Sequence, residues 1–241
     1  MKITKHLTVS QLAFLPNVFP VNCYFVEEVE GLTLIDAALP SSASSIIDAA
    51  QKIGKPITRI VLTHAHDDHV GSLDRLKQEL PAVKVYISFR DSILLAGERT
   101  LQPGEPQTPI RGGVPTKVKT KPDVLLRDGE QIGSLLALSV PGHTPGSMAF
   151  FDTRNGALIA GDAFQTRGGV AVTGQLKPLF PFPAMATWNK ELALESARKL
   201  RELSPSLLAT GHGRMIESPA AIIDQAIQNA EKNLQKKKQV V

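Results

Sequence analysis

The sequence is poor in cysteine and in long apolar runs, and each scarcity excludes a class of protein. Cys23 is the single cysteine among 241 residues, so the chain cannot be a disulfide-stapled scaffold. We expect Cys23 to be a small buried residue of a strand, in a protein of the reducing cytoplasm. No segment reaches the about 20 uninterrupted apolar residues of a membrane span, and Pro16 and polar residues interrupt the N-terminal segment where a secretory signal has its apolar core.

Aromatic residues are few, and neither sign of charge is in large excess. The 27 lysines and arginines stand against 23 aspartates and glutamates, which gives a net charge of +4. These charges are mixed along the chain, whereas a nucleic-acid surface needs a concentrated basic patch, so nucleic acid is disfavoured as a partner. Because 42% of the residues are apolar, the chain can bury a core. We expect a single domain over residues 1–241 and leave its oligomeric state open.

Strand patterns and helix patterns alternate along the chain. We expect strands at residues 1–9, 22–28, 32–36, 59–63, 83–88, 123–126, 135–140, 148–152, 157–160 and 206–209. We expect helices at residues 42–53, 70–80, 89–98 and 187–203, and a last one that starts at Ser218–Pro219. Two strand-rich halves with helices outside predict a layered α/β sandwich. Residues 99–122 and the apolar segment 163–187 are expected to be long loops, and both are candidates for a substrate pocket.

Histidine is concentrated in a patch that directly follows the strand expected at residues 59–63. The patch carries His64, His66, Asp68 and His69. Residues two apart on an extended chain point to the same side, so His64 and His66 can hold one ion. A turn just after them can bring Asp68 and His69 towards a second position nearby. Imidazole and carboxylate ligands suit zinc, iron, manganese or nickel, and they need no thiolate.

Three later residues of metal-ligand type share one local design. His143, Asp162 and His212 each lie just after an apolar strand and beside glycine. In α/β sheets ligands collect outside the strand ends, and glycine lets the backbone approach an ion closely. His6 stands apart from these patches, and we expect it to be a hydrogen-bonded structural residue. Asp67 is expected to be a solvated loop residue.

The ordered set His64-x-His66-x-Asp68-His69, His143, Asp162 and His212 resembles the signature of the metallo-β-lactamase superfamily. The resemblance covers nearly the whole chain from Asn22 onwards. It implies a four-layer αββα sandwich with two divalent metal ions, for which zinc is the favoured identity and iron or manganese the alternatives. The first ion would be held by His64, His66 and His143, the second by Asp68, His69 and His212, with Asp162 bridging both. Asp36, where relatives often carry aspartate, is a candidate to orient a ligand histidine.

This resemblance implies a metal-dependent hydrolase that acts on a small molecule. A hydroxide between the two ions would attack an ester, thioester or lactone, and Asp68 would be a catalytic residue that accepts or donates a proton. Relatives of the glyoxalase II type carry a C-terminal glutathione-binding domain, but only 29 residues follow His212 here. Three alternatives remain: a phosphodiesterase or RNA-processing hydrolase, a mononuclear iron oxidoreductase of the persulfide dioxygenase type, and a metal-binding module without catalysis.

Overall fold

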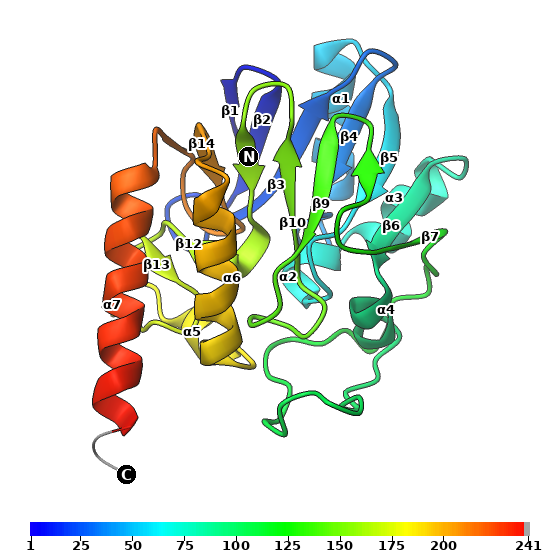
Figure 1. Cartoon of the computed structure of the whole chain (residues 1–241). Coiled ribbons are helices and arrows are strands. Elements are labelled where there is room, and N and C mark those ends of the chain that lie inside the picture. Colours follow the sequence, from blue (N-terminus) through cyan, green and yellow to red (C-terminus); the bar gives the residue numbers. More distant parts are fainter. Residues whose placement is uncertain (239–241) are drawn as a thin grey trace.

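The larger of the two main sheets is built by the first half of the chain (Figure 1). The structure, a computed structural model, describes residues 1–238, so residues 239–241 of the expected single domain lie outside it. Within the described residues this sheet has seven strands in sequence order: β1 (Lys2–His6), β2 (Val9–Phe14), β3 (Val21–Glu27), β4 (Leu32–Ile35), β5 (Ile57–Val61), β6 (Lys84–Ser88) and β7 (Val124–Leu126). The strands from β1 to β4 pair antiparallel, and those from β4 to β7 pair parallel.

The second sheet is built by the second half of the chain. In the described part of the chain it has six strands: β8 (Gln131–Ile132), β9 (Leu135–Ser139), β10 (Met148–Asp152), β11 (Ala157–Ile159), β14 (Leu207–Ala209) and β15 (Ile216–Glu217). Strand β10 is antiparallel to both β9 and β11, and β11 is parallel to β14. The strands β9, β11 and β14 therefore run in one direction and end at the same edge. A small separate ribbon pairs β12 (Phe164–Gln165) with β13 (Ala171–Val172).

The helices lie outside the sheets or at the end where the strands finish. They are α1 (Ala43–Ile53), α2 (Asp67–Val70), α3 (Leu73–Glu79), α4 (Phe89–Leu95), the 3-10 turn η1 (Gly161–Ala163), α5 (Phe182–Ala186), α6 (Lys190–Glu202) and α7 (Ala220–Lys238). The side chain of Asn189 accepts a hydrogen bond from Leu192 N and so starts α6. Among residues 1–238, no helix combines the length and the apolar character that crossing a membrane requires.

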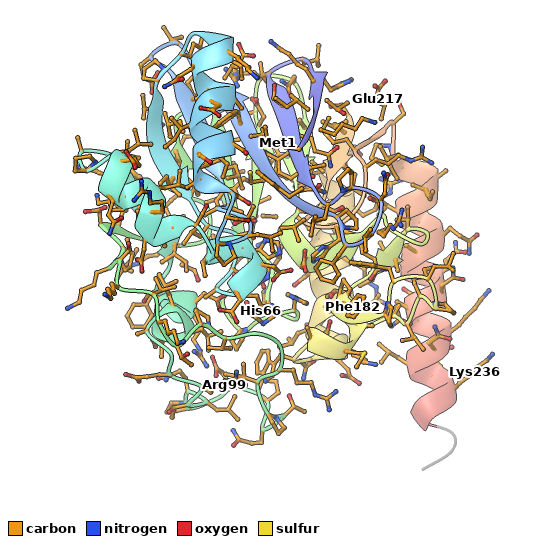
Figure 2. All side chains as sticks on the ribbon, turned by 180° about the vertical axis from the view of Figure 1, so that it is seen from behind. Met1, His66, Arg99, Phe182, Glu217 and Lys236 are labelled. Carbon is orange, nitrogen blue, oxygen red and sulfur yellow. The ribbon has the colours of Figure 1, made fainter. Side chains whose placement is uncertain are left out.

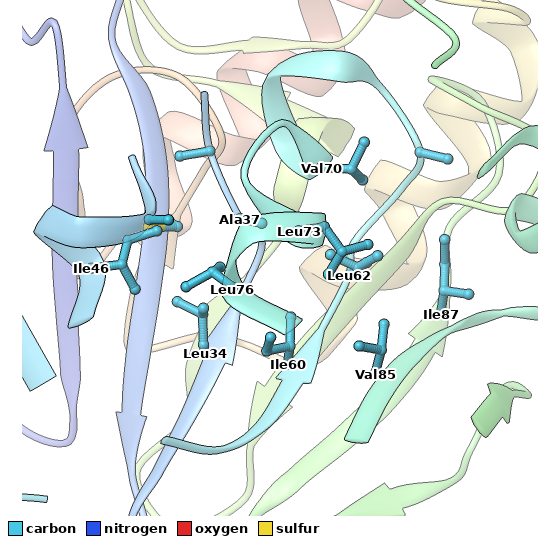
Figure 3. Packing of buried hydrophobic residues seen from close by; sticks show 14 of the residues in the cluster. Leu34, Ala37, Ile46, Ile60, Leu62, Val70, Leu73, Leu76, Val85 and Ile87 are labelled. Atoms are coloured by element: carbon cyan, nitrogen blue, oxygen red, sulfur yellow. The ribbon is translucent and has the colours of Figure 1, made fainter. Parts of the chain in front are cut away.

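Neighbouring residues on the strands face two different cores, as the two-residue period of a strand requires. Leu34 and Ile60 pack with helices α1 and α3 on the outer face of the first sheet (Figure 3). Their neighbours Ile35 and Val61 point the other way, into a core that also holds Phe150 of the second sheet. A third core lies between the second sheet and the helices α6 and α7, which run side by side in Figure 1. The layer order is therefore αββα, and the predicted fold class is confirmed.

The structure corrects several predicted elements. Residues 1–9 are not one strand: the chain turns at Leu7, whose φ of 49° is left-handed, and β1 and β2 form a hairpin. The turn contains neither glycine nor asparagine, the residues that usually mark a two-residue hairpin turn, so the sequence did not predict it. The helix predicted at 70–80 is divided into α2 and α3 at Gly71, whose N–H donates to Ala38 O. The segment 163–187 is not a plain loop, because it contains β12, β13 and α5.

Candidate metal centre

Four strand ends deliver the residues of the candidate centre. His64 and His66 follow β5, His143 follows β9, Asp162 lies in η1 after β11, and His212 follows β14. Strands β9, β11 and β14 end at the same edge of the second sheet. The end of β5 is joined to that edge because Met148 N, at the start of β10, donates to Thr63 O over 2.8 Å. The sheet topology alone therefore gathers residues that lie up to 148 positions apart in the sequence, from His64 to His212.

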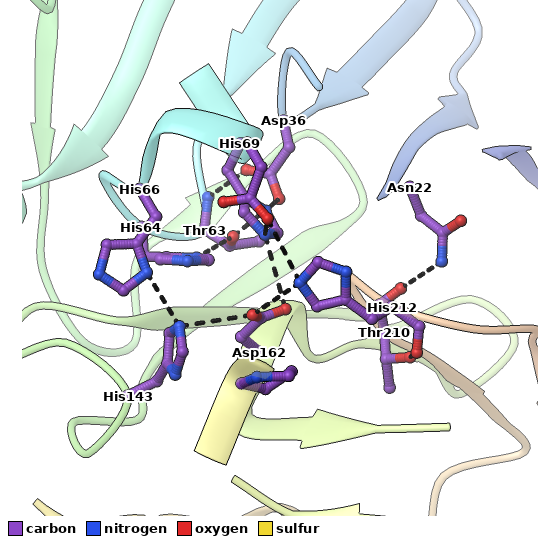
Figure 4. Close-up of polar contacts among 12 residues, drawn as sticks. Asn22, Asp36, Thr63, His64, His66, His69, His143, Asp162, Thr210 and His212 are labelled. Carbon is purple, nitrogen blue, oxygen red and sulfur yellow. Dashed lines mark hydrogen bonds and ion pairs between the residues drawn. The ribbon is translucent and has the colours of Figure 1, made fainter. Parts of the chain in front are cut away.

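All seven predicted ligand residues are brought together in one cluster. Figure 4 labels these residues except Asp68. Their ligand atoms form three groups in which every atom lies within 4.8 Å of the others: His64, His66 and His143; Asp68, His69 and His212; and His64, His69 and Asp162. The first two groups match the two sets that the superfamily resemblance implied. The third group contains one histidine from each of these sets and Asp162. Asp162 thus lies near both sets, where a bridging carboxylate is expected.

Asp162 lies at the middle of the cluster. Its Oδ2 is 3.4 Å from His143 Nε2 and 3.2 Å from His212 Nε2, and its Oδ1 is 3.6 Å from His69 Nε2. Two ligands at about 2.0–2.1 Å from one tetrahedral zinc ion are about 3.3 Å apart, so these separations suit shared coordination. The side chain of Asp162 is only 3% exposed, whereas that of Asp68 is 28% exposed. Asp68 is therefore the carboxylate of the cluster that reaches the solvent.

Each of the five histidines has one ring nitrogen turned towards the cluster and the other within hydrogen-bond distance of an oxygen. The outer contacts are His64 Nδ1 to Thr63 Oγ1 at 3.0 Å, His66 Nε2 to Arg111 O at 3.0 Å, His69 Nδ1 to Asp36 Oδ2 at 2.7 Å, His143 Nδ1 to Thr173 Oγ1 at 3.1 Å and His212 Nδ1 to Pro20 O at 2.7 Å. A partner that accepts from the outer nitrogen leaves the inner one with a free lone pair, the form that binds a metal.

Asp36 makes the contact that was expected of it. Its carboxylate accepts from Thr63 N at 2.7 Å and from Thr63 Oγ1 at 2.8 Å, and it faces His69 Nδ1. The backbone of Asp36 is left-handed, with a φ of 62°. Aspartate tolerates this conformation better than most residues, so the sharp turn after β4 can aim the carboxylate at the centre.

A second buried carboxylate braces two of the loops and was not found from the sequence. Asp91 on α4 is fully buried, and its oxygens accept from Ala65 N at 2.9 Å, from Thr144 Oγ1 at 2.8 Å and from Gly146 N at 2.8 Å. It thereby links the loop of His64 and His66 to the loop of His143. Burial raises the pKa of Asp91 to about 6. A lone aspartate in an amphipathic helix gives no sequence signal for such a role.

The long segment 99–122 closes one side of the cluster. Arg111 O faces His66, and Gly113 O accepts from Asp67 N at 2.7 Å. A Cβ atom on Gly112 would collide with the ring of His66, so only glycine fits between them. Trp188 ties this segment to the second half of the molecule by donating from Nε1 to Thr108 O over 2.7 Å. Asp67 is exposed beside it, as expected, but it is the first residue of helix α2 and not a loop residue.

Three buried atoms at the centre lack a hydrogen-bond partner among the described residues: His64 Nε2, His69 Nε2 and Asp162 Oδ1. They belong to the three residues that form the third group described above. Buried polar atoms are normally satisfied, because an unsatisfied one costs about 1–3 kcal/mol. A divalent cation would satisfy all three at once, and the donors are nitrogen and oxygen of the kind that zinc and iron accept. The residues present therefore fit a metal ion.

The charges of the cluster are also those of a cation site. Burial lowers the pKa of His64 well below its usual range and that of His143 to about 3, so both rings are neutral at pH 7. Burial alone would also lower the pKa of His69, but the carboxylates of Asp162 and Asp36 outweigh it and raise that pKa to about 10. A proton on His69 thus balances carboxylates whose charge a metal ion would otherwise balance, and binding of the ion would release it.

A cavity of about 400 Å³ opens over the centre. We call its histidine and aspartate side the floor: His66, Asp68, His143, Asp162 and His212. We call its apolar side the wall: Phe19, Phe182, Pro183, Met185 and Ala186. In Figure 2 the labelled His66 and Phe182 lie on the same side of the molecule. The segment 163–187 is therefore partly pocket and partly core. Phe182 and Met185 line the cavity, Phe164 and Phe180 are buried in packing, and Leu179 is 84% exposed outside the cavity.

Comparison with known proteins identifies the family. The model of the metallo-β-lactamase superfamily matches residues 16–212. The chain belongs to the metallo-β-lactamase superfamily. Superfamily relatives include the Bacillus subtilis proteins YobT, 61% identical over 232 residues (96% of this chain and all of YobT), and the probable metallo-hydrolase YflN, 32% identical over 80% of each chain. A hydroxyacylglutathione hydrolase of Gloeobacter violaceus is 28% identical, but the match covers 63% of this chain and 52% of that enzyme.

One solved structure to which the chain is similar carries metal. TTHA1623 in a di-iron-bound form superposes with a TM-score of 0.63 at 26% identity, over 87% of this chain and 95% of that one. The superfamily membership and the names of these relatives support a metal-dependent enzyme of the hydrolase kind.

Proposed function

We propose that the chain is a binuclear metallohydrolase that cleaves a small ester, thioester or lactone. The observation that carries this proposal is the pair of ligand groups joined through Asp162, with three unsatisfied buried atoms between them. A pair of divalent ions, when bound, supplies Lewis acids and lowers the pKa of water towards neutrality. The ligand set proposed for them is the one given by the sequence: His64, His66, Asp68, His69, His143, Asp162 and His212.

The residues of the chain supply orientation and proton transfer. The outer hydrogen bonds of the five histidines hold the rings in fixed positions, so that little reorganisation accompanies the reaction. Asp68 Oδ2 lies 3.4 Å from His212 Nε2, on the solvent side of the cluster. Because Asp68 is the partly exposed carboxylate, we assign to it the transfer of a proton to the leaving group. A small-molecule substrate fits a cavity of about 400 Å³.

The alternatives differ from this proposal in features of the site. A phosphodiesterase would gain from cationic side chains, but the described residues that line the cavity include neither lysine nor arginine. A mononuclear iron oxidoreductase would leave the group of Asp68, His69 and His212 without an ion. The di-iron form of TTHA1623 supports iron as an alternative metal within a binuclear site.

A cytoplasmic location stays a prediction from the single cysteine, which is buried in β3 as expected.

A substrate panel tests the proposal. The metal-loaded protein is assayed on an aryl ester, an acyl thioester, a γ-lactone and a bis-aryl phosphodiester, with chelator-treated protein as the control. We expect hydrolysis of at least one of the first three, loss of that activity on chelation and its return with added Zn²⁺ or Fe²⁺. Cleavage of the phosphodiester alone would contradict the proposal, as would hydrolysis that is unaffected by chelation.

A further inference from the structure

The wall is an apolar surface that the protein leaves largely uncovered. Phe182 is 50% exposed and Met185 is 64% exposed, although both face the cavity over the candidate metal centre. Isolated exposed apolar residues are ordinary on proteins, whereas a group that lines a cavity beside reactive residues marks a ligand site. The wall is also held in place, because the ring centroids of Phe19 and Phe182 are 4.9 Å apart and Phe19 lies 5.6 Å from the ring of His212.

The wall carries no group that would recognise a charged substituent. The described residues that line this cavity include three aspartates, Asp67, Asp68 and Asp162, and neither lysine nor arginine. A phosphate or carboxylate on that side of a substrate would find no cationic partner. An aliphatic or aromatic group would instead lose contact with water against Phe19, Phe182 and Met185.

A second groove leaves the centre in another direction. It has a volume of about 500 Å³ and is lined by Leu39, Pro40, Asp67, Asp68, Val70, Gly71, Asp74 and residues 115–118. Asp67 and Asp68 are the residues that it shares with the cavity over the floor. Asp68 therefore lies at the junction of the two spaces. A group that receives a proton from Asp68 must lie beside this junction, with the second groove open behind it.

We propose, on the basis of the function proposed above, that the wall binds the apolar acyl part of the substrate while the leaving group points into the second groove. Phe182 and Met185 are then the residues that select the acyl chain. The substrate class is an ester, thioester or lactone whose acyl side is an uncharged hydrocarbon of several carbons. The leaving group is the part that can carry charge, because the apolar lining of its groove also includes Lys117, Asp67 and Asp74, whereas the wall has no charged side chain.

Two substrate series test this orientation. In the first, the acyl chain of a thioester with one fixed thiol is lengthened from acetyl to octanoyl, below the critical micelle concentration. We expect kcat/KM to rise by about two- to fourfold for each added methylene until the wall is covered. In the second series the acetyl group is kept and an alkyl leaving group is lengthened, for which we expect no such rise. Equal rises in both series, or none in the acyl series, would overturn the proposal.

Substitutions in the wall test which residues cause the preference for long acyl chains. Phe182→Ala should lower the ratio of kcat/KM for the octanoyl and acetyl substrates by about tenfold, because a ring is lost from the acyl site. Leu179→Ala is the matched control, since Leu179 is an exposed apolar residue of the same segment that does not line the cavity. It should keep the wild-type ratio. An unchanged ratio in Phe182→Ala, or an equal fall in Leu179→Ala, would contradict the assignment.

A binding measurement separates this proposal from the proposed function. Calorimetry of the metal-loaded protein with octanoate and with acetate should give tighter binding of octanoate, and Phe182→Ala should remove most of that difference. Failure of every ester, thioester and lactone to react would end the proposed function, but a preference for octanoate would still support an apolar acyl site. Hydrolysis without acyl-chain preference, and equal affinity for the two carboxylates, would end the acyl proposal alone.

Discussion

The floor and the wall of the cavity are built in opposite ways. On the floor the imidazoles of His66, His143 and His212 are buried, and the outer nitrogen of each ring has a hydrogen-bond partner. The wall presents half-exposed side chains from α5, a helix of five residues, and from the loop that carries Phe19. A side chain fixed by burial and hydrogen bonds tolerates little change, whereas an exposed apolar one can be exchanged without loss of the fold. The difference suggests that the chemistry is fixed by the floor and the substrate by the wall.

The largest effect is expected from removing a ligand of the floor. In His66→Ala the first ligand group loses one of its three histidines, so metal-dependent turnover should fall to the background rate on every substrate of the panel. The matched control is His6→Ala, because His6 lies in β1 beside Glu217 and outside the centre. Turnover by His66→Ala near the wild-type rate would remove the binuclear mechanism and with it the contrast between floor and wall.

A substitution at Gly211, next to His212 of the floor, should lower turnover almost as much. A Cβ atom on Gly211 would collide with Asp162 Oδ1 and with the ring of His69. Gly211→Ala should therefore displace the bridging carboxylate and lower kcat by about 100-fold. In Gly113→Ala the added Cβ would contact only the exposed Asp67 side chain, at 3.0 Å from Oδ2 and 3.5 Å from Cβ, so this control should lose much less. Both are checked by steady-state kinetics, and equal losses in the two variants would contradict the prediction.

A smaller effect is expected when the support of a ligand is changed. Asp36→Asn keeps a residue that tolerates the left-handed backbone but weakens the contact with His69 Nδ1. The affinity for metal should fall by about 10- to 100-fold, as measured by competition with a chelating dye. The control Asp48→Asn removes the same charge from an exposed position of α1. A wild-type affinity for metal in Asp36→Asn would show that the contact of Asp36 with His69 does not affect metal binding.

The smallest effect on the protein itself is expected at the wall. Met185→Ala truncates a side chain that is 64% exposed, so the free energy of unfolding should change by no more than about 0.5 kcal/mol. The number of bound metal ions should stay the same, while KM for an octanoyl thioester rises. Denaturant titration, metal analysis and kinetics check the three quantities. A loss of bound metal in this variant would contradict the claim that the wall takes no part in metal binding.

The clustering of the seven candidate ligands was predicted from the sequence more completely than any other feature of the molecule. His64, His66, Asp68 and His69 lie within six residues, and the others follow apolar strands beside glycine, so order and local pattern were enough. The supporting contacts were less accessible. Arg111 contributes a backbone carbonyl, which has no residue-specific signal, and Asp91 acts across 53 positions on Thr144.

The sequence indicated which segment contains the wall but not which residues form it. The apolar composition of 163–187 predicted either packing or a pocket, and both occur. Phe180 is buried while Phe182, two positions later, faces the cavity, because the short helix α5 begins between them and turns the second ring outwards. A single short turn of helix in a segment rich in proline and glycine has too weak a periodic signal to be predicted. Such placement depends on long-range contacts, such as that of Phe19 with Phe182.

The number of metal ions per chain tests the central claim most directly. The protein is stripped with chelator, titrated with Zn²⁺ and in parallel with Fe²⁺ under anaerobic conditions, freed of unbound ions, and analysed for metal and protein. The account predicts that two ions are retained per chain and that hydrolysis of an ester, thioester or lactone returns with them. Retention of one iron per chain without hydrolytic activity, or of no metal at all, would contradict it.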